Sequence, residues 1–539
     1  MPADTLVTRA PQHARNRLRA ARRHFRAVDT ALRRASTYAH PAGRIVRIET
    51  HISVVYLAGR YAYKIMKPVD FGFVDFTQPA ARQRCCEAEI RLNRPFAASI
   101  YVGVEPLTRD ARGCRLGRRD ARARVVDHAV KMRRFDERML FSNLLARGEL
   151  LPADIDAAAD HLVDSYRHAP RAPATRPYGT SAQLREVVLA PLDTLERAAH
   201  TAQRVRDAGL RAYCERAFER FGAHLDARRA SGFVRACHGD LHLDNIVRHG
   251  RRALMFDCIE FSETLRWIDV ASDFAFLYMD LLAHGRADLA NRLFARYLET
   301  TGDYGCLPVL RLFVVYRALV RAMVAVLKGA PTLASTYLDL AIAQTRPQHP
   351  ALLLCHGFSG SGKSAASRAL AQLTGAIRLS SDTERKRARP FEPPDLRTLP
   401  ADAYTPDAIA AQYGRLADHA RMALVAGYTV IVDATFLARA ARERFAALAG
   451  ELRVPWLILD FDASPACLAQ RVRARALGPR DASDAGEAVL AAQRAQAEPF
   501  SAQERASTIA FDTDVPLDAF TRRAYWEPLL AHAAFSGSR

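Results

Sequence analysis

The stretch "CHGDLHLDNIV" (residues 237–247) places two histidines, two aspartates and an asparagine within eight positions and then turns apolar. Its glycine and its many Asp and Asn residues predict a loop, because such residues favour turns over helix interiors. A zinc site is the alternative, since His238 and His242 are four residues apart. However, no glutamate follows His238 as it does in a zinc hydrolase helix. The stretch is therefore predicted to be a polar catalytic loop.

Three residues of this loop have the spacing of a phosphoryl-transfer site. His238, Asp240 and Asn245 follow the pattern H-x-D-x-x-x-x-N. In this pattern the aspartate orients or deprotonates the acceptor hydroxyl, and the asparagine binds Mg²⁺. A second metal-binding aspartate is expected after the next short strand, and "RRALMFDCIEF" (251–261) supplies Asp257. We therefore expect Asp240 to be catalytic, and Asn245 and Asp257 to bind the metal.

A lysine upstream fits the nucleotide-binding role that such a site needs. Only six of the 78 basic residues are lysines, so a lysine is unusual in this chain and indicates a specific requirement. Lys64 lies in "YAYKIM" (61–66), a strand suited to a lysine that holds the α- and β-phosphates of ATP. Glu89, on the helical run that follows, is expected to pair with Lys64, and Glu87 is the alternative partner.

The arrangement of these motifs predicts the domain organisation. Short β-rich runs with one helical run come first, and mostly helical patterns follow, which indicates a two-lobed α+β domain. A proline-bearing linker, "TRPQHP" (345–350), separates it from strands that alternate with helices. That alternation indicates an α/β domain with a parallel sheet. The predicted boundaries are 1–43 for a basic helical leader, 44–345 for the first domain with lobes 44–140 and 141–345, and 350–539 for the second.

The second domain begins with a phosphate-binding loop. The motif Gly357-x-x-x-x-Gly362-Lys363-Ser364 lies between an apolar strand and a helix, as such a loop requires. Its backbone N–H groups curl around phosphate oxygens, its lysine reaches the β- and γ-phosphates, and its serine hydroxyl meets Mg²⁺. The expected ATP-binding residues are Gly357, Phe358, Ser359, Gly360, Ser361, Gly362, Lys363 and Ser364, with Ser364 also a metal ligand.

Further residues of this domain are assigned by resemblance. "SSDTERKR" (380–387) and "VIVDATF" (430–436) follow the loop, and the segment resembles the small-molecule and polynucleotide kinase branch of the P-loop proteins. The resemblance implies that Asp382 is the base and that Arg385 contacts the acceptor or a phosphate. Asp433 ends an apolar strand, where the second acidic residue of such sites lies near the metal. The arginine-rich run "RVRARALGPR" resembles the lid of these kinases, which implies that Arg471, Arg475 or Arg480 stabilises the transferring phosphoryl group.

The first domain resembles the aminoglycoside phosphotransferase-like branch of the kinase fold, on "HGDLHLDN" (238–245) and "LRWIDVASDFAFL" (265–277). Residues 40–530 as a whole look like a bacterial family that fuses this kinase to a P-loop ATP-binding domain. The resemblance implies a protein-kinase-like fold followed by a P-loop fold, and it implies the use of ATP. The chain departs from the kinase pattern in having no G-x-G-x-x-G loop, and "ETHIS" (49–53) takes its place, where Thr50 or Ser53 would cover the phosphates.

Composition limits the partners. The net charge of +20 indicates a nucleic-acid ligand as one alternative, but the basic residues are spread along the chain and are almost all arginine. There is no Cys-x-x-Cys pair, no apolar run of membrane-spanning length and no signal peptide, so a cytoplasmic protein is expected. The leading hypothesis is an ATP- and Mg²⁺-dependent phosphotransferase with two sites and small hydroxyl-bearing acceptors. The alternative is a polynucleotide 5′-hydroxyl kinase whose first domain is a non-catalytic regulatory module.

Overall fold

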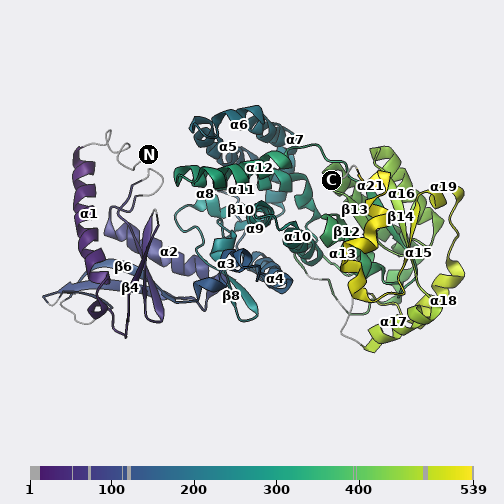
Figure 1. The fold of residues 1–539 in the computed structure, drawn as a ribbon, viewed down its shortest axis with the longest axis horizontal. Helices are drawn as coiled ribbons and strands as arrows, with labels where there is room; N and C mark the ends of the chain where they lie inside the picture. Colours follow the sequence, from purple (N-terminus) through teal and green to yellow (C-terminus); the bar gives the residue numbers. More distant parts are fainter. Residues whose placement is uncertain are drawn as a thin grey trace. The chain divides into compact units, whose positions relative to one another are not determined.

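A computed structural model (Figure 1) divides the chain into two compact units. Unit 1 comprises Met1–Leu184, Arg229–Leu277 and Leu327–Ala330, and unit 2 comprises Arg185–Arg228, Tyr278–Val326 and Pro331–Arg539. The structure describes residues 12–50, 52–70, 75–111, 113–117, 123–392, 394–395, 397–477 and 483–536, without the side chains of 12–17, 401, 475–477, 534 and 536.

Unit 1 is built on an antiparallel sheet of six strands in the order β1-β2-β3-β6-β4-β5. The alternation of side chains along β2 and β3 sends successive residues to opposite faces. Tyr63 and Ile65 face one side, and Ala62, Lys64 and Met66 face the other. The strands are β1 (Val46–Glu49), β2 (Ser53–Ala58), β3 (Tyr61–Met66), β4 (Tyr101–Asp110), β5 (Gly113–Leu116) and β6 (Arg124–Arg133).

Helices cover both faces of this sheet (Figure 1). Helix α2 (Pro79–Ala97) packs Cys86 and Ile90 on the face that carries Lys64. Helix α1 (Gln12–Leu32) packs Val28 and Leu32 on the other face, against Tyr56 and Tyr63. The basic segment predicted as a leader therefore contributes apolar side chains to the core of unit 1, and Arg19, Arg22, Arg23 and Arg26 of the same helix are exposed.

A buried ion pair ties α2 to β6. Arg82 donates to both carboxylate oxygens of Asp127 at 2.9–3.2 Å and to the Phe76 carbonyl at 2.8 Å. Both side chains are at most 2% exposed. Truncating one partner leaves the other charge buried and uncompensated, a loss of about 3–5 kcal/mol.

Arg82→Ala is therefore expected to destabilise unit 1 by about 3–5 kcal/mol. Hydrogen exchange of the β6 amides measures this locally, without interference from unit 2. The control is Arg84→Ala, which removes an exposed arginine of the same helix and should change stability by no more than about 0.5 kcal/mol. Equal protection in the two variants would show that water replaces the guanidinium at Asp127.

The rest of unit 1 carries the polar loop. The loop follows strand β7 (Val234–Ala236), which pairs with β10 (Trp267–Asp269), and it leads into a two-stranded hairpin of β8 (Ile246–His249) and β9 (Arg252–Met255). Helix α9 (Val270–Ala283) begins directly after β10. The remaining helices are α3 (Phe141–Ala146), α4 (Pro152–His168) and α8 (Glu263–Arg266).

Unit 2 contains a parallel sheet of five strands in the order β12-β13-β11-β14-β15. The central strand, β11 (Leu352–His356), is apolar because helices cover both faces of a parallel sheet. The other strands are β12 (Ile377–Ser380), β13 (Val430–Asp433), β14 (Trp456–Asp462) and β15 (Thr508–Asp512). The helices of this sheet are α13 (Lys363–Thr374), α14 (Ser381–Arg385), α15 (Pro406–Val425), α16 (Arg439–Leu452), α17 (Pro465–Leu477), α18 (Glu487–Gln496), α19 (Ala502–Ala506), α20 (Glu527–Leu530) and α21 (Ala533–Ser536).

Helices that precede the linker pack in the same unit. Helix α10 contacts α13 directly. These helices are α5 (Ser181–Arg197), α6 (Ala202–Asp207), α7 (Leu210–Ala230), α10 (Ala287–Thr301), α11 (Leu307–Leu327) and α12 (Pro331–Gln344). Within the described residues, no helix is both long and apolar enough to span a membrane. The predicted fold class is confirmed: a kinase-like α+β sheet region is followed by an α/β P-loop domain with a parallel sheet.

Candidate active sites

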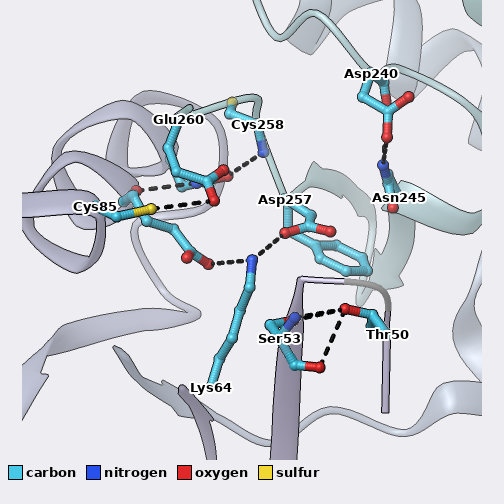
Figure 2. A network of polar contacts seen from close by, with 12 residues as sticks. Thr50, Ser53, Lys64, Cys85, Asp240, Asn245, Asp257, Cys258 and Glu260 are labelled. Carbon is cyan, nitrogen blue, oxygen red and sulfur yellow. Dashed lines mark hydrogen bonds and ion pairs between the residues drawn. The ribbon is translucent and has the colours of Figure 1, made fainter. Parts of the chain in front are cut away.

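The first candidate site, the kinase-loop site, centres on Lys64 of β3 (Figure 2). Its ammonium group lies 3.0 Å from Oε1 of Glu89 and 2.6 Å from Oδ1 of Asp257. Burial alone would lower the pKa of Lys64, but the charges of Asp257 and Glu89 outweigh it and raise the pKa well above its usual value. Lys64 is therefore a fixed cation. Glu87, the alternative partner, instead accepts a hydrogen bond from Gln83 at 2.9 Å.

The predicted catalytic aspartate and asparagine lie together in the loop after β7 (Figure 2). Nδ2 of Asn245 donates to Oδ2 of Asp240 at 3.1 Å and to the Asp240 carbonyl at 2.8 Å. Asn245 is buried, whereas the Asp240 side chain is 38% exposed. Because the amide nitrogen is committed to Asp240, the amide oxygen of Asn245 is oriented away from it. The loop thus presents one carboxylate and one amide oxygen.

A buried aspartate holds the backbone of this loop. Asp273, at the start of α9, accepts hydrogen bonds from the N–H groups of His238 and Gly239 at 3.1 and 2.8 Å, and from the Tyr166 hydroxyl at 3.0 Å. Gly239 has a φ of 86°, and a Cβ there would lie 2.9 Å from the Leu265 carbonyl oxygen. Glycine is therefore required at the position where protein kinases carry arginine. Asp269, four residues before Asp273, caps α9 by accepting a hydrogen bond from the Ala271 N–H at 2.8 Å.

Both histidines of the loop have a partner through Nε2: that of His242 lies 3.4 Å from Nδ2 of Asn245. The His238 ring is fully buried and its Nε2 lies 2.9 Å from the Phe256 carbonyl oxygen. Burial lowers the pKa of His238, so the ring is neutral at pH 7 and donates from Nε2. Among the described residues, no group of three or more His, Cys, Asp or Glu side chains is arranged to hold a metal ion. The zinc alternative therefore has no support from the geometry.

Asp257 occupies a strained backbone position at the end of β9. Its φ is 63°, which is unusual for a residue other than glycine, and its N–H donates to the Tyr101 hydroxyl at 3.0 Å. The next N–H, of Cys258, donates to Oδ1 of Asn93 at 2.9 Å. These bonds from β4 and α2 hold the turn, so the carboxylate of Asp257 faces Lys64. Strain at a residue that is so well supported is typical of functional sites.

Glu260 is part of this site although the sequence analysis did not identify it (Figure 2). Burial raises the pKa of Glu260, and the thiol of Cys85 donates to its Oε1 at 3.5 Å. Burial also raises the pKa of Glu89, whose Oε2 is buried without a hydrogen-bond partner. Three carboxyl groups therefore share the single charge of Lys64. The one feature of the sequence that could have indicated Glu260 is its position three residues after Asp257.

The hairpin that replaces a glycine-rich loop is closed by side chains. Oγ1 of Thr50 lies 2.8 Å from Oγ of Ser53 and accepts the Ser53 N–H at 3.0 Å (Figure 2). Lys67 donates to the Thr50 carbonyl at 2.9 Å. These bonds define a compact β1–β2 turn. The hydroxyl groups of Thr50 and Ser53 bond to each other in this turn.

The second candidate site, the P-loop site, lies at the carboxyl end of β11. Gly357 has a φ of 135°, and a Cβ there would lie 2.6 Å from the Phe461 carbonyl oxygen. The loop ends at Lys363, whose ammonium group donates to the Phe358 carbonyl at 2.8 Å. Parallel pairing sets Cys355 of β11 beside Asp433 of β13, so the loop and Asp433 meet at one edge of the sheet. This edge is where α/β folds bind ligands.

A cleft of about 1300 Å³ opens over the P-loop. Its lining includes Lys363, Ser364, Asp382, Arg385 and Asp433, all predicted site residues. Arg385 lies 3.9 Å from Asp382 and stacks on the Tyr404 ring, 4.8 Å from its centroid. Burial would raise the pKa of Asp433, but Arg378 and Lys363 outweigh this and lower it. The cleft therefore brings together an anionic aspartate, a serine hydroxyl and cationic side chains.

The predicted lid arginines lie only partly within the described residues. Arg471, on α17, donates to the carbonyls of Thr513 and Val515 at 2.7 and 3.1 Å. The side chain of Arg475 and the whole of Arg480 lie outside the described residues.

A contact that the sequence did not indicate joins α18 to the P-loop. The Ser359 N–H donates to Oε1 of Gln493 at 2.9 Å, and Nε2 of Gln493 donates back to Oγ of Ser359 at 3.0 Å.

Asp382→Asn is expected to stabilise unit 2 at neutral pH. Burial raises the pKa of Asp382 above its ordinary value of 3.8, so ionisation disfavours the folded state as the pH rises through the folded pKa. Asparagine removes that penalty, so the gain in melting temperature should grow as the pH rises above the ordinary pKa of 3.8 and level off once the carboxyl group is ionised in the folded state. Scanning calorimetry measures it, with the exposed Asp402→Asn as control. A gain in melting temperature that does not depend on pH would contradict the raised pKa of Asp382.

Family models match both halves of the chain. The model described as "Phosphotransferase enzyme family" matches residues 124–311, and the one described as "AAA domain" matches residues 352–500. The first match contains Asp240, Asn245 and Asp257 but begins after Lys64 and Glu89, and the second match contains the P-loop. Fold, motifs and family matches together define the class: the chain is a kinase-type phosphotransferase in which an aminoglycoside phosphotransferase-like domain precedes a P-loop kinase-like domain.

The relatives narrow this class to one family. The proteins "Uncharacterized protein Rv2004c" of Mycobacterium tuberculosis (strain H37Rv) and "Uncharacterized protein Mb2027c" of Mycobacterium bovis are each 30% identical over 462 residues. Each alignment covers 83% of this chain and 89% of the relative. The chain therefore belongs to the family of these mycobacterial proteins.

Two solved structures show more distant likenesses. The GDP and kanamycin complex of APH(2")-IIia is 15% identical, covers 59% of this chain and 98% of that chain, and has a TM-score of 0.37. A gluconokinase from Sinorhizobium meliloti 1021 is 22% identical, covers 35% of this chain and 98% of that chain, and has a TM-score of 0.25. The family models and the mycobacterial relatives, not these likenesses, carry the assignment.

Proposed function

We propose that this phosphotransferase uses ATP at two separate sites, and that each site transfers the γ-phosphoryl group to a hydroxyl acceptor. The observation that carries the proposal is the contact of Lys64 with both Glu89 and Asp257. A kinase site requires this lysine–glutamate pair and the metal-binding aspartate in the same place. The two partners come from distant parts of the chain: Glu89 is 25 positions from Lys64, and Asp257 is 193 positions from it.

The residues present suit a magnesium ion at both sites. Asn245 and Asp257 offer an amide oxygen and a carboxylate in the kinase-loop site, and Ser364 and Asp433 offer a hydroxyl and a carboxylate in the P-loop site. These are hard oxygen donors in small number, which is how proteins hold Mg²⁺ together with substrate phosphates. When bound, the ion would neutralise charge on the phosphates and help to orient them.

In the kinase-loop site, Lys64 would bind the α- and β-phosphates of ATP and remain charged throughout. Asp240 would accept the proton of the acceptor hydroxyl as the new O–P bond forms and the β–γ bridging bond breaks, with ADP as the leaving group. Its 38% exposed carboxylate is open to an acceptor. The bond from Asn245 fixes its orientation, which is the positioning that this chemistry depends on.

In the P-loop site, Lys363 and the loop N–H groups would bind the β- and γ-phosphates. Asp382 would accept the acceptor proton, and burial raises the pKa of Asp382 toward the range of a general base. Arg385 lies beside it, and its Nε is buried without a hydrogen-bond partner within the described part of the chain. That nitrogen is suited to an anionic group of the acceptor or to the transferring phosphoryl group.

The test is an acceptor screen with three full-length proteins: the wild type, Asp240→Asn and Lys363→Ala. Each is incubated with ATP, Mg²⁺ and pools of sugars, aminoglycosides, small alcohols and 5′-hydroxyl oligonucleotides, and phosphorylated products are identified by mass spectrometry. Two sets of products, each lost in one variant only, are expected. Loss of every product in Lys363→Ala alone would instead make the first domain non-catalytic. Oligonucleotide products would support the polynucleotide kinase alternative.

A further inference from the structure

A row of ion pairs connects helix α10 to the edge of the P-loop site. Oε1 of Glu299, in the last turns of α10, lies 3.4 Å from Nη1 of Arg378 on β12. Nη2 of the same guanidinium donates to Oδ2 of Asp433 at 2.5 Å. Glu299 also lines the cleft that contains Asp433. One arginine thus joins a glutamate before the linker to a candidate metal ligand after it.

Arg378 holds Asp433 from more than one direction. Its Nε donates to Oγ of Ser367 at 2.8 Å, and that hydroxyl donates to Oδ2 of Asp433 at 3.1 Å. The side chains of Arg378 and Asp433 are only 9% and 3% exposed. All three nitrogens of the planar guanidinium therefore have a described acceptor: a glutamate, an aspartate and a serine. A fork of fixed donors orients a carboxylate far better than a point charge does.

Helix α10 is itself firmly attached to the P-loop fold. Nδ2 of Asn291 donates to the Gln372 carbonyl at 3.0 Å. Arg387 donates to the carbonyls of Glu299 and Thr300 at 2.6 and 3.0 Å, so these carbonyl groups in the last turn of α10 have hydrogen-bond partners. These contacts fix α10 against α13, its neighbour in Figure 1. Glu299 therefore presents its carboxylate from a rigid element and not from a loop.

We propose that Glu299 and Arg378 are positioning residues of the P-loop site. Glu299 holds part of the Arg378 guanidinium, and Arg378 holds Oδ2 of Asp433, which fixes the orientation of the carboxylate. Helix α10 lies within the segment that matches the phosphotransferase family, whereas Asp433 lies in the AAA-domain match. The P-loop site is therefore completed by a residue from the other family segment. The inference rests on the proposed role of Asp433 in holding Mg²⁺.

The sign of the effect follows from the shared charge. Arg378 lies between two carboxylates, and Glu299, which also pairs with Arg368 at 3.0 Å, offsets part of the positive charge of Arg378. Without Glu299, the guanidinium would pair with Asp433 alone and neutralise it more completely, which disfavours a second cation there. The carboxylate would also lose an anchor of its geometry. Both effects weaken the response of the site to Mg²⁺.

The experiment compares full-length wild type, Glu299→Gln and Arg378→Lys by hydrogen exchange. Amides of α13 and β13 are followed with ADP while the Mg²⁺ concentration is raised, so the kinase-loop site does not contribute to the signal. Protection is expected to reach its half-maximum at a Mg²⁺ concentration roughly tenfold higher in both variants, which corresponds to a tenfold weaker ion site. ADP alone should protect α13 equally in all three proteins.

The control is Glu451→Gln, which makes the same chemical change in an exposed ion pair with Arg421 and should behave as the wild type. Wild-type Mg²⁺ response in both test variants would overturn the positioning role and leave the proposed function intact. Absence of any Mg²⁺ response in the wild type would instead overturn the proposed metal site. Thermal melts without nucleotide complete the test: if both variants unfold at the assay temperature, the ion pairs are structural and the inference is wrong.

Discussion

Asp240→Asn is expected to lower turnover at the kinase-loop site by about 10²–10⁴-fold, the usual contribution of a positioned general base. Asparagine keeps the size of the side chain and can still contact Asn245, but it cannot accept the proton of the acceptor hydroxyl. The nucleotide contacts proposed for Lys64 and Asp257 do not involve Asp240, so KM for ATP should remain within a few-fold of the wild type. Initial rates with an acceptor specific to this site measure both quantities.

The matched control for that variant is Asp244→Asn. Asp244 lies in the same loop, its side chain is 56% exposed, and its carboxylate lies 3.6 Å from the His242 ring. The same change of charge in the same loop should leave kcat nearly unchanged. Equal losses in the two variants would mean that loop charge, and not proton transfer at Asp240, limits the rate. Full activity of Asp240→Asn would mean that the loop binds nucleotide without catalysing transfer.

Lys363→Ala is expected to lower kcat at the P-loop site by about 10²–10³-fold, because it removes a preorganised cation from the transferring phosphoryl group. Lys363 is buried at the start of α13, and its ammonium group now meets the Phe358 carbonyl. That contact offers a neutral acceptor only, so we expect the lysine to turn to the phosphates when nucleotide binds. Products made at the kinase-loop site should be unaffected.

Lys328→Ala, at an exposed lysine, controls for the loss of one positive charge from a chain of net charge +20. It should leave both activities unchanged. If Lys363→Ala removed the products of both sites together, the two sites would be coupled and could not be assayed as independent enzymes. If it removed neither, the P-loop would serve binding or regulation. Product identification for each variant distinguishes these outcomes.

The motifs of both candidate sites could be recognised in the sequence because each is short and local. Asp240 and Asn245 are five residues apart, and the loop that carries them needs only local turns and one glycine. The P-loop is likewise one strand, one glycine-rich turn and one helix. Lys64 could be identified because lysine is rare in this chain. The order of strands and helices along the chain also follows from residue patterns, since the hydrophobic periods of two residues in a strand and 3.6 residues in a helix are local properties.

The partners of these residues could not be predicted in the same way. The sequence favoured Glu89 as the partner of Lys64 but left Glu87 as an alternative, and the packing of α2 on the sheet places Glu89 against Lys64. Glu260 joined the site because the turn after Asp257 directs it toward Cys85. Arg378 looked like one arginine among many until its ion pairs with Glu299 and Asp433 were seen.

The sequence by itself determined the two nucleotide motifs, the order of the domains and the identity of the candidate catalytic groups, because each depends on residues close together in the chain. The tertiary structure alone decided which carboxylate meets Lys64, that α1 packs on the first sheet, and that α10 reaches the P-loop site. Those contacts join residues from 25 to 193 positions apart. Their selection depends on burial and shape complementarity between folded elements, and no local pattern encodes it.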